Sequence, residues 1–262
     1  MSVSSTIAGH AEGGRPLKFH QLSTQDLRQA FARGVDDWKS CHSETLVLCV
    51  VYPIAGILAG AMWAAPNLLP FLFPILAGFA LLGPLATLWF SALSKAREEQ
   101  GAASAEAAGK VFDTDRRQTI QGLAMIAVAL YLAWIVAAGL IYDNYFGGQA
   151  VKGLGFFVTV LTTSQGQAMA VVGTLVGALF AVVMLGIGVI AFPAALDRDI
   201  GVGEALLAAF QGMIRNPLVL FGWGGLVAVL LVLGALPLLL GLAIVLPVLG
   251  HSTWHLYRAM TD

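Results

Sequence analysis

Four long stretches without a charged residue constrain the fold of this chain more than any other feature. They are Thr45–Ser94, Gln118–Tyr142, Gly153–Leu196 and Asn216–Tyr257. A helix of about 20 apolar residues crosses the hydrocarbon core of a bilayer. Of the 262 residues, 58% are hydrophobic and 11% are charged, whereas soluble domains carry about 25% charged residues. The sequence therefore predicts an all-α polytopic membrane protein.

The charge-free stretches divide into about six predicted transmembrane helices in three hairpins. The first stretch is interrupted at Pro66 and Asn67, and the last near Gly234 to Pro237. The predicted spans lie near 45–64, 69–93, 119–142, 168–192, 217–234 and 237–256. Segment 153–163 is either interfacial or inserted in the membrane, which leaves five or seven spans as alternatives.

The lysines and arginines fall almost entirely on one side of this predicted topology. Thirteen of the 14 lie in the N-terminal segment, in the loops after the second and fourth spans, or in the C-terminal tail; only Lys152 lies on the other side. Cytoplasmic loops of membrane proteins carry the excess of Lys and Arg. Both termini are therefore predicted to be cytoplasmic. The N-terminal segment has no apolar core and small-residue cleavage site, so no signal peptide is expected.

The chain is divided into a disordered tail at 1–22, an interfacial amphipathic helix at 23–43 and a membrane domain at 44–262. Ser23 and Asp26 have the spacing of a capping box. Five residues share one helical face: Leu27, Phe31, Gly34, Val35 and Trp38. Such a helix lies in the cytoplasmic interface with Trp38 at headgroup depth, as an anchor or as a docking surface for a partner. Segment 202–216 has a similar pattern.

Glycine and proline spacings indicate how the spans pack and repeat. Pro84, Pro193 and Pro247 each lie toward the cytoplasmic end of a returning span, where proline frees a carbonyl group and can kink the helix. The first and last hairpins share their Gly and Pro spacing, which suggests parallel repeats. Such repeats occur in transporters and in plain membrane scaffolds. Gly173 and Gly177 allow close contact between helices.

His251 and His255 are the candidate cofactor residues, because no other histidines lie in a predicted span. At positions i and i+4 they share a helix face and could hold Zn or Cu with further ligands, or each bind a haem. The favoured interpretation is simpler: Trp254 and Tyr257 form part of an aromatic belt, and Arg258 marks the cytoplasmic flank. Contact with a substrate is the third alternative. The cofactor is left open.

Other chemistry has little support in the sequence. No predicted span has Asp, Glu, Lys or Arg at its middle, which argues against an ion-coupled carrier. Phosphate-binding loops, C-x-x-C and G-x-S-x-G motifs are absent, so enzyme activity is not favoured and no nucleic-acid partner is expected. Cys41 and His42 follow Asp36 and Asp37 closely, but this spacing matches no known metal site, and a metal site at the cytoplasmic mouth is not favoured.

The tail "LPVLGHSTWHLYR" at 246–258 resembles the signature of a bacterial integral-membrane family, domain of unknown function (DUF) 2189. The segments "FPILAGFALLGPLA" at 73–86 and "FPAALDRDIGVGEAL" at 192–206 are similar to other motifs of that family, and the likeness runs from about Leu22 to the end. The resemblance implies a bacterial inner-membrane location and a shared signature at His251, Trp254, His255 and Arg258. Some members are labelled cytochrome c oxidase subunits, although two histidines in the spans are too few for a catalytic subunit.

Two functions follow as hypotheses. The first is a non-catalytic accessory subunit or assembly factor of a membrane complex, with respiratory complexes among the candidates and a membrane-protein partner or a second copy in contact. The alternative is a transporter or channel for a small neutral or amphipathic solute. In both, the lipid bilayer surrounds the protein. An enzyme acting on a lipid or haem intermediate through His251 and His255 is a more distant alternative.

Overall fold

The computed structural model describes residues 17–41, 83–101, 104–110, 112, 116–147, 155–237 and 240–261. Every regular element within these ranges is a helix. The helices are α1 (Thr24–Ser40), α4 (Gly83–Gln100), α5 (Ala105–Lys110), α6 (Arg116–Phe146), α7 (Gly155–Thr162), α8 (Ser164–Gly186), the π-helical turn η2 (Ile187–Ala191), α9 (Phe192–Asp197), α10 (Val202–Arg215), α11 (Pro217–Ala235) and α12 (Leu242–Thr261). The predicted span at 45–64 and residues 69–82 of the next lie outside the described residues.

Three helical segments of the described residues are long and apolar enough to cross a membrane. They are Arg116–Phe146, Ser164–Asp197 and Pro217–Ala235, and they contain the predicted spans 119–142, 168–192 and 217–234. The prediction of an all-α membrane protein is thus confirmed, while the number of spans stays a prediction. Helix α12 is not among the three segments, because its C-terminal half carries His251, His255 and Arg258.

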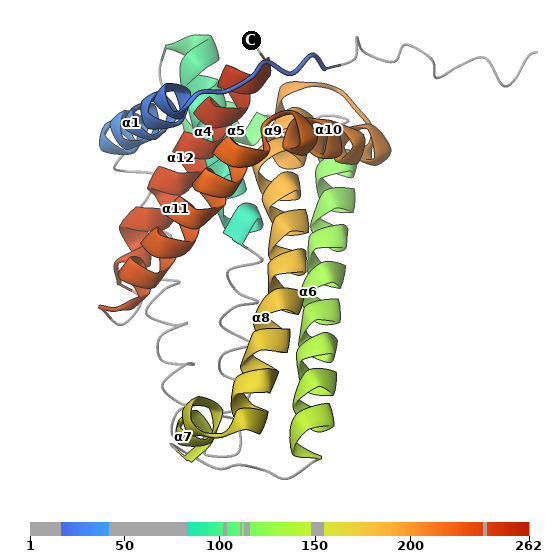
Figure 1. Ribbon diagram of the computed structural model, residues 1–262. Coiled ribbons are helices and arrows are strands. Elements are labelled where there is room, and N and C mark those ends of the chain that lie inside the picture. The colour runs from blue at the N-terminus through green and yellow to red at the C-terminus, as the bar shows by residue number, and fades with distance from the viewer. Residues whose placement is uncertain are drawn as a thin grey trace, which may run out of the picture.

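The helices form two pairs with shorter helices at one end (Figure 1). Helices α6 and α8 run side by side, and α11 and α12 form the second pair. Helix α10 lies across one end of the α6–α8 pair, and α1 packs against α12 at that same end, near the C-terminus. Helix α7 lies at the opposite end. We call the end formed by α1, α5, α9, α10 and the last turns of α12 the polar end.

Helix α1 begins with the predicted capping box. The Ser23 hydroxyl accepts from the backbone N–H of Asp26, and the Asp26 carboxylate accepts from the backbone N–H of Ser23. Its buried face differs from the predicted apolar face. Ala30, Gly34 and Asp37 are buried, whereas the large apolar side chains beside them are half-buried. The small residues let α12 approach closely, since a Cβ on Gly34 would lie 2.0 Å from Oγ of Ser252.

Residues just before α1, expected to belong to a disordered tail, are bonded to the helices. Asn216, at the junction of α10 and α11, accepts from the backbone N–H of Leu22 at 2.7 Å and donates to the carbonyl of His20 at 2.9 Å. The backbone N–H of His20 donates to the carbonyl of Met260 at 2.8 Å. Because Asn216 is buried, these bonds satisfy polar groups that water does not reach. They fix residues 20–22 to the polar end.

The helix that contains Pro193 widens one turn before it. From Ser164 the helix runs through η2 into α9, and the backbone N–H of Phe192 donates to the carbonyl of Ile187, five residues back. Proline lacks the donor of a regular helix and its ring collides with the preceding turn, and a π-helical turn accommodates it. On the same stretch, a Cβ on Gly188 would lie 2.6 Å from Cγ of Pro84, so α4 and η2 are in close contact. Pro247 lies inside α12 and is buried.

Candidate functional site

Asp37 lies at the centre of a polar cluster that joins α1, α4 and α12. Its side chain is almost fully buried, with the residue 5% exposed. Ser94 donates its hydroxyl to Oδ2 at 2.5 Å, and Nε2 of His255 lies 2.8 Å from the same oxygen. Arg97 donates to Oδ1 at 2.5 Å. Because a carboxylate only accepts, His255 carries its proton on Nε2 in this arrangement. Three helices are therefore connected through one buried charge.

His251 extends the cluster into the core. Its Nδ1 lies 2.8 Å from Oγ of Ser94 and 4.0 Å from Oδ2 of Asp37. Since Ser94 gives its proton to Asp37, His251 donates from Nδ1. The other ring nitrogen, Nε2, is buried and has no hydrogen-bond partner among the described residues. The ring packs at 5.4 Å from Phe90, between centroids. His251 is thus held by one polar contact and by packing.

The pKa of Asp37 reflects competing effects. Burial raises this pKa, but the hydrogen bonds from His255 and Ser94, together with the two histidine rings, more than offset the burial. The net result is a pKa below the ordinary value of 3.8. The carboxylate is therefore charged at neutral pH, although it lies in the interior of a helix junction.

A second group of contacts joins the ends of α4, α9 and α12. Glu98 accepts from Nε1 of Trp254 at 2.7 Å and from Nε of Arg258 at 3.0 Å. The hydroxyl of Tyr257 donates to Asp197 at 3.1 Å. Trp254 and Tyr257 are both buried, so they pack inside the molecule instead of facing headgroups as an aromatic belt would. Arg258, near the C-terminal end of α12, is a partner of Glu98.

A pocket of about 370 Å³ opens beside Asp37 at the polar end. The residues that line it, within the part of the chain that the structure describes, belong to α1, α4 and α12. They are Arg33, Asp37, Ser94, Arg97, Glu98, His255 and Arg258. We call it the arginine pocket. Three guanidinium groups and two carboxylates lie around it.

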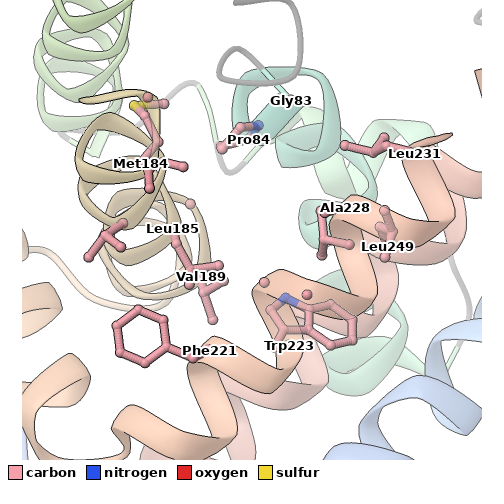
Figure 2. A pocket seen from close by; sticks show the side chains of 18 of the residues that line it. Gly83, Pro84, Met184, Leu185, Val189, Phe221, Trp223, Ala228, Leu231 and Leu249 are labelled. Atoms are coloured by element: carbon pink, nitrogen blue, oxygen red, sulfur yellow. The ribbon is translucent and has the colours of Figure 1, made fainter. Parts of the chain in front are cut away.

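A larger pocket of about 500 Å³ lies between the two helix pairs. Figure 2 shows Met184, Leu185 and Val189 of the α8–η2 segment facing Phe221 and Trp223 of α11 across this space. Leu249 of α12 and Pro84 of α4 border it too, so one of the three predicted kink prolines lines a cavity. None of the described lining residues is charged. We call it the apolar pocket.

The two hydroxyls that α4 and α12 bring to the apolar pocket are already engaged. Thr87 donates to the carbonyl of Pro84 at 3.1 Å, and Thr253 donates to the carbonyl of Leu249 at 2.7 Å. Small residues form much of the wall on α8 and α11, including Gly173, Gly177 and Gly224. Gly177 also makes the predicted close contact, since a Cβ there would lie 3.0 Å from the Trp134 ring. The pocket is therefore a space for apolar groups.

The two histidines share one side of α12, as predicted, and both point to Asp37. Within the described residues, no group of three or more His, Cys, Asp or Glu side chains could hold a metal ion. Trp38 is half-buried on α1. Haem binding at His251 and His255 stays a prediction that the geometry does not test.

Comparison with known families gives one match. The model described as "Predicted integral membrane protein (DUF2189)" matches residues 72–197. Over this segment, which is just under half of its length, the chain is similar to the DUF2189 family. No curated protein and no solved structure matches it. The matched segment holds Ser94, Arg97, Glu98 and Asp197. The tail with His251 and His255 lies outside it, as does Asp37.

The sequence interpretation missed the partners of the histidines. In the sequence, Asp37 is notable only as a neighbour of Cys41 and His42, and Ser94 closes an apolar stretch without any motif. One signal was available in α1: Ala30, Gly34, Asp37 and Cys41 recur at spacings of four, three and four, which places them on one helix face. All four are buried. A charged residue in register with small residues indicates a buried ion pair at a close helix contact.

Proposed function

We propose that this membrane protein binds an amphipathic molecule by its acyl or other apolar chain and moves it within or across the bilayer. The apolar pocket carries this proposal. Its volume of about 500 Å³ lies in the range of small-molecule sites, which are mostly apolar with few polar groups. An uncharged lining suits a neutral chain and offers nothing to an ion.

The walls of the apolar pocket support a role in movement. One wall is the π-helical turn η2, and such turns occur frequently at functional sites. Pro84 of α4 rests against Gly188 of this turn. A helix with one widened turn has two nearby hydrogen-bonding patterns, so a small shift of η2 changes the pocket without unfolding the helix.

A pair of substitutions on α11 tests the binding step. Ala228 lines the apolar pocket, whereas its neighbour Val229 is exposed on the outer surface. Ala228→Phe fills the pocket, and Val229→Phe adds the same ring outside it. We expect purified Ala228→Phe to retain at least tenfold less of a fluorescent acyl-chain phospholipid than wild type, and Val229→Phe to match wild type. Equal retention by all three proteins would overturn the proposal.

Transport is measured separately from binding. Wild-type protein in vesicles is expected to expose inner-leaflet fluorescent phospholipid to an external quencher faster than empty vesicles do, and Ala228→Phe is expected not to. If the protein binds phospholipid but does not move it, the binding proposal stands and the transport proposal is refuted.

The accessory-subunit hypothesis has a different support. In the most apolar part of α6, only 11% of the residues are buried within the molecule. The remaining surface contacts lipid or another membrane protein. Purification from native membranes in mild detergent decides between them: stoichiometric membrane subunits would support the accessory role, and a lone particle would remove it. We further propose that the polar end faces the cytoplasm of a bacterial inner membrane, in line with its Lys and Arg.

A further inference from the structure

The arginine pocket has an excess of hydrogen-bond donors. Neither of its two carboxylates has a free oxygen. In Asp37, Oδ2 accepts from Ser94 and His255 and Oδ1 accepts from Arg97. In Glu98, Oε1 accepts from Arg258 and Oε2 accepts from Trp254. All four oxygens are thus engaged in contacts within the fold.

Arg33 is the unmatched charge of this pocket. It is exposed on α1, and within the described part of the chain it has no ion pair or hydrogen bond. Its neighbour in the pocket, Arg97, is paired with Asp37 and Asp36. The lining therefore has three guanidinium groups and two carboxylates. The guanidinium group without a carboxylate partner, that of Arg33, is the most accessible of the three. What the pocket still lacks is an acceptor with negative charge.

We propose that the arginine pocket binds a phosphate group. Guanidinium donors match phosphate oxygens with two parallel hydrogen bonds, and the volume of about 370 Å³ leaves room for the group and the atoms attached to it. His255, which lines the pocket and is partly exposed, adds a polar wall. The phosphate comes from the headgroup of an anionic phospholipid or from a soluble phosphate ester. This inference does not depend on what occupies the apolar pocket.

The position of the pocket is compatible with both sources. It lies between α1 and the ends of α4 and α12, at the polar end where the spanning segment Arg116–Phe146 begins. Phospholipid phosphates lie at the depth where spanning helices leave the hydrocarbon, and soluble phosphate esters reach the same surface from water. Basic residues near a membrane surface attract anionic lipids.

Arg33→Gln tests the site, with Arg28→Gln as its matched control. Both arginines are exposed on α1, but only Arg33 lines the pocket. The full-length protein in neutral detergent is titrated with phosphatidylglycerol and, separately, with glycerol 3-phosphate. Binding is followed by native mass spectrometry and by the unfolding temperature. We expect Arg33→Gln to weaken binding about tenfold, the value of one charge-assisted hydrogen bond, and Arg28→Gln to match wild type.

The two ligands separate the sources. An effect of Arg33→Gln on phosphatidylglycerol alone supports a lipid headgroup, and an effect on glycerol 3-phosphate supports a soluble phosphate ester. Because Arg33 has no ion pair or hydrogen bond with the described residues, the unfolding temperature of Arg33→Gln without ligand is expected to equal that of wild type. No binding of either ligand, or equal binding by the two variants, would overturn the proposal.

Discussion

Asp37 shows how one residue holds a helix junction together at the residue scale. A buried carboxylate loses its hydration, which costs several kcal/mol unless donors replace the lost water. Ser94, His255 and Arg97 supply those donors from two other helices. The same contacts that make the charge tolerable also make α1 depend on α4 and α12. Stability and helix position are therefore set by the same atoms.

Replacing Asp37 tests this dependence. Asp37→Asn keeps the size of the side chain but removes the charge, and it leaves Arg97 with a weaker partner. We expect a loss of about 2–4 kcal/mol in unfolding free energy. Asp36→Asn is the control, because the Asp36 side chain is 71% exposed and lies 3.4 Å from Arg97; exposed pairs contribute about 0–1 kcal/mol. Denaturant unfolding in detergent measures both, and equal losses would contradict a central role for Asp37.

The lowered pKa of Asp37 gives a pH dependence with a defined direction. A carboxyl whose folded pKa lies below its unfolded value stabilises the fold above that value, and the contribution is lost as pH falls through the folded pKa. We expect α1 to stay protected down to about pH 4, near the ordinary value of 3.8, and to open below it. Hydrogen exchange of α1 amides, corrected for intrinsic rates, measures the opening. Asp37→Asn should lack this acid step, and an unchanged step in that variant would contradict the assignment.

The residue-scale site was partly predictable from sequence. His251 and His255 stood out because polar residues are rare in an apolar stretch, and their shared face followed from helical spacing. Their partner Asp37 is more than 200 residues away, at a separation of 218 from His255. Helical periodicity gives the face of a residue but not which distant helix meets it. The pairing therefore required the structure.

Close approach of three helices is the corresponding feature at the element scale. Helix α12 lies between α1 and α4, and glycines allow the contact on both sides. A Cβ on Gly34 would lie 2.5 Å from the backbone nitrogen of Ser252, and one on Gly250 would lie 2.7 Å from the carbonyl oxygen of Thr87. Since backbone atoms cannot move aside, these two positions fix the spacing at which Asp37 reaches its donors.

Gly34→Ala tests the spacing. The added methyl group requires α1 to move away from α12, and we expect a destabilisation of about 1–3 kcal/mol, typical of overpacking. Gly203→Ala is the matched control in α10, because no atom lies within 4 Å of a Cβ there; alanine stabilises a helix relative to glycine by up to about 1 kcal/mol. Opposite signs for the two changes in unfolding temperature are expected. A neutral Gly34→Ala would contradict the close packing of α1.

Element positions followed from the sequence more closely than element contacts did. The spans at 119–142, 168–192 and 217–234 each lie inside a candidate membrane helix, because length and hydropathy are local properties. At Pro193 the sequence predicts a kink, because proline has no backbone N–H to donate. It does not predict that a π-helical turn accommodates the proline. The polar half of α12 was assigned to an aromatic interface, whereas α1 and α4 bury it.

At the scale of the whole molecule, both ends of the described chain lie at the polar end. The hydrogen bond from His20 to Met260 joins them directly. From there α6 leads away, the α8–α9 segment leads back, α11 leads away again and α12 returns. Arg97, near the end of α4, meets Asp37 of α1 at this same end. We therefore expect an even number of membrane crossings between α1 and the end of α4.

This parity leads to a topology prediction that labelling can check. Cys41 and Cys49 are replaced by alanine, and single cysteines are introduced by Gln25→Cys, Ala259→Cys and Thr162→Cys, all at exposed positions. We expect an impermeant maleimide to label Thr162→Cys on intact cells, and to label the other two only after the membrane is opened. That pattern fits six crossings with a cytoplasmic polar end. The charge-free stretches predict two crossings up to the end of α4 and four after it, and both numbers are even. Labelling of Gln25→Cys and Ala259→Cys from opposite sides would overturn the shared end, because two residues on opposite sides of a bilayer cannot both lie at a junction tied by His20 and Met260.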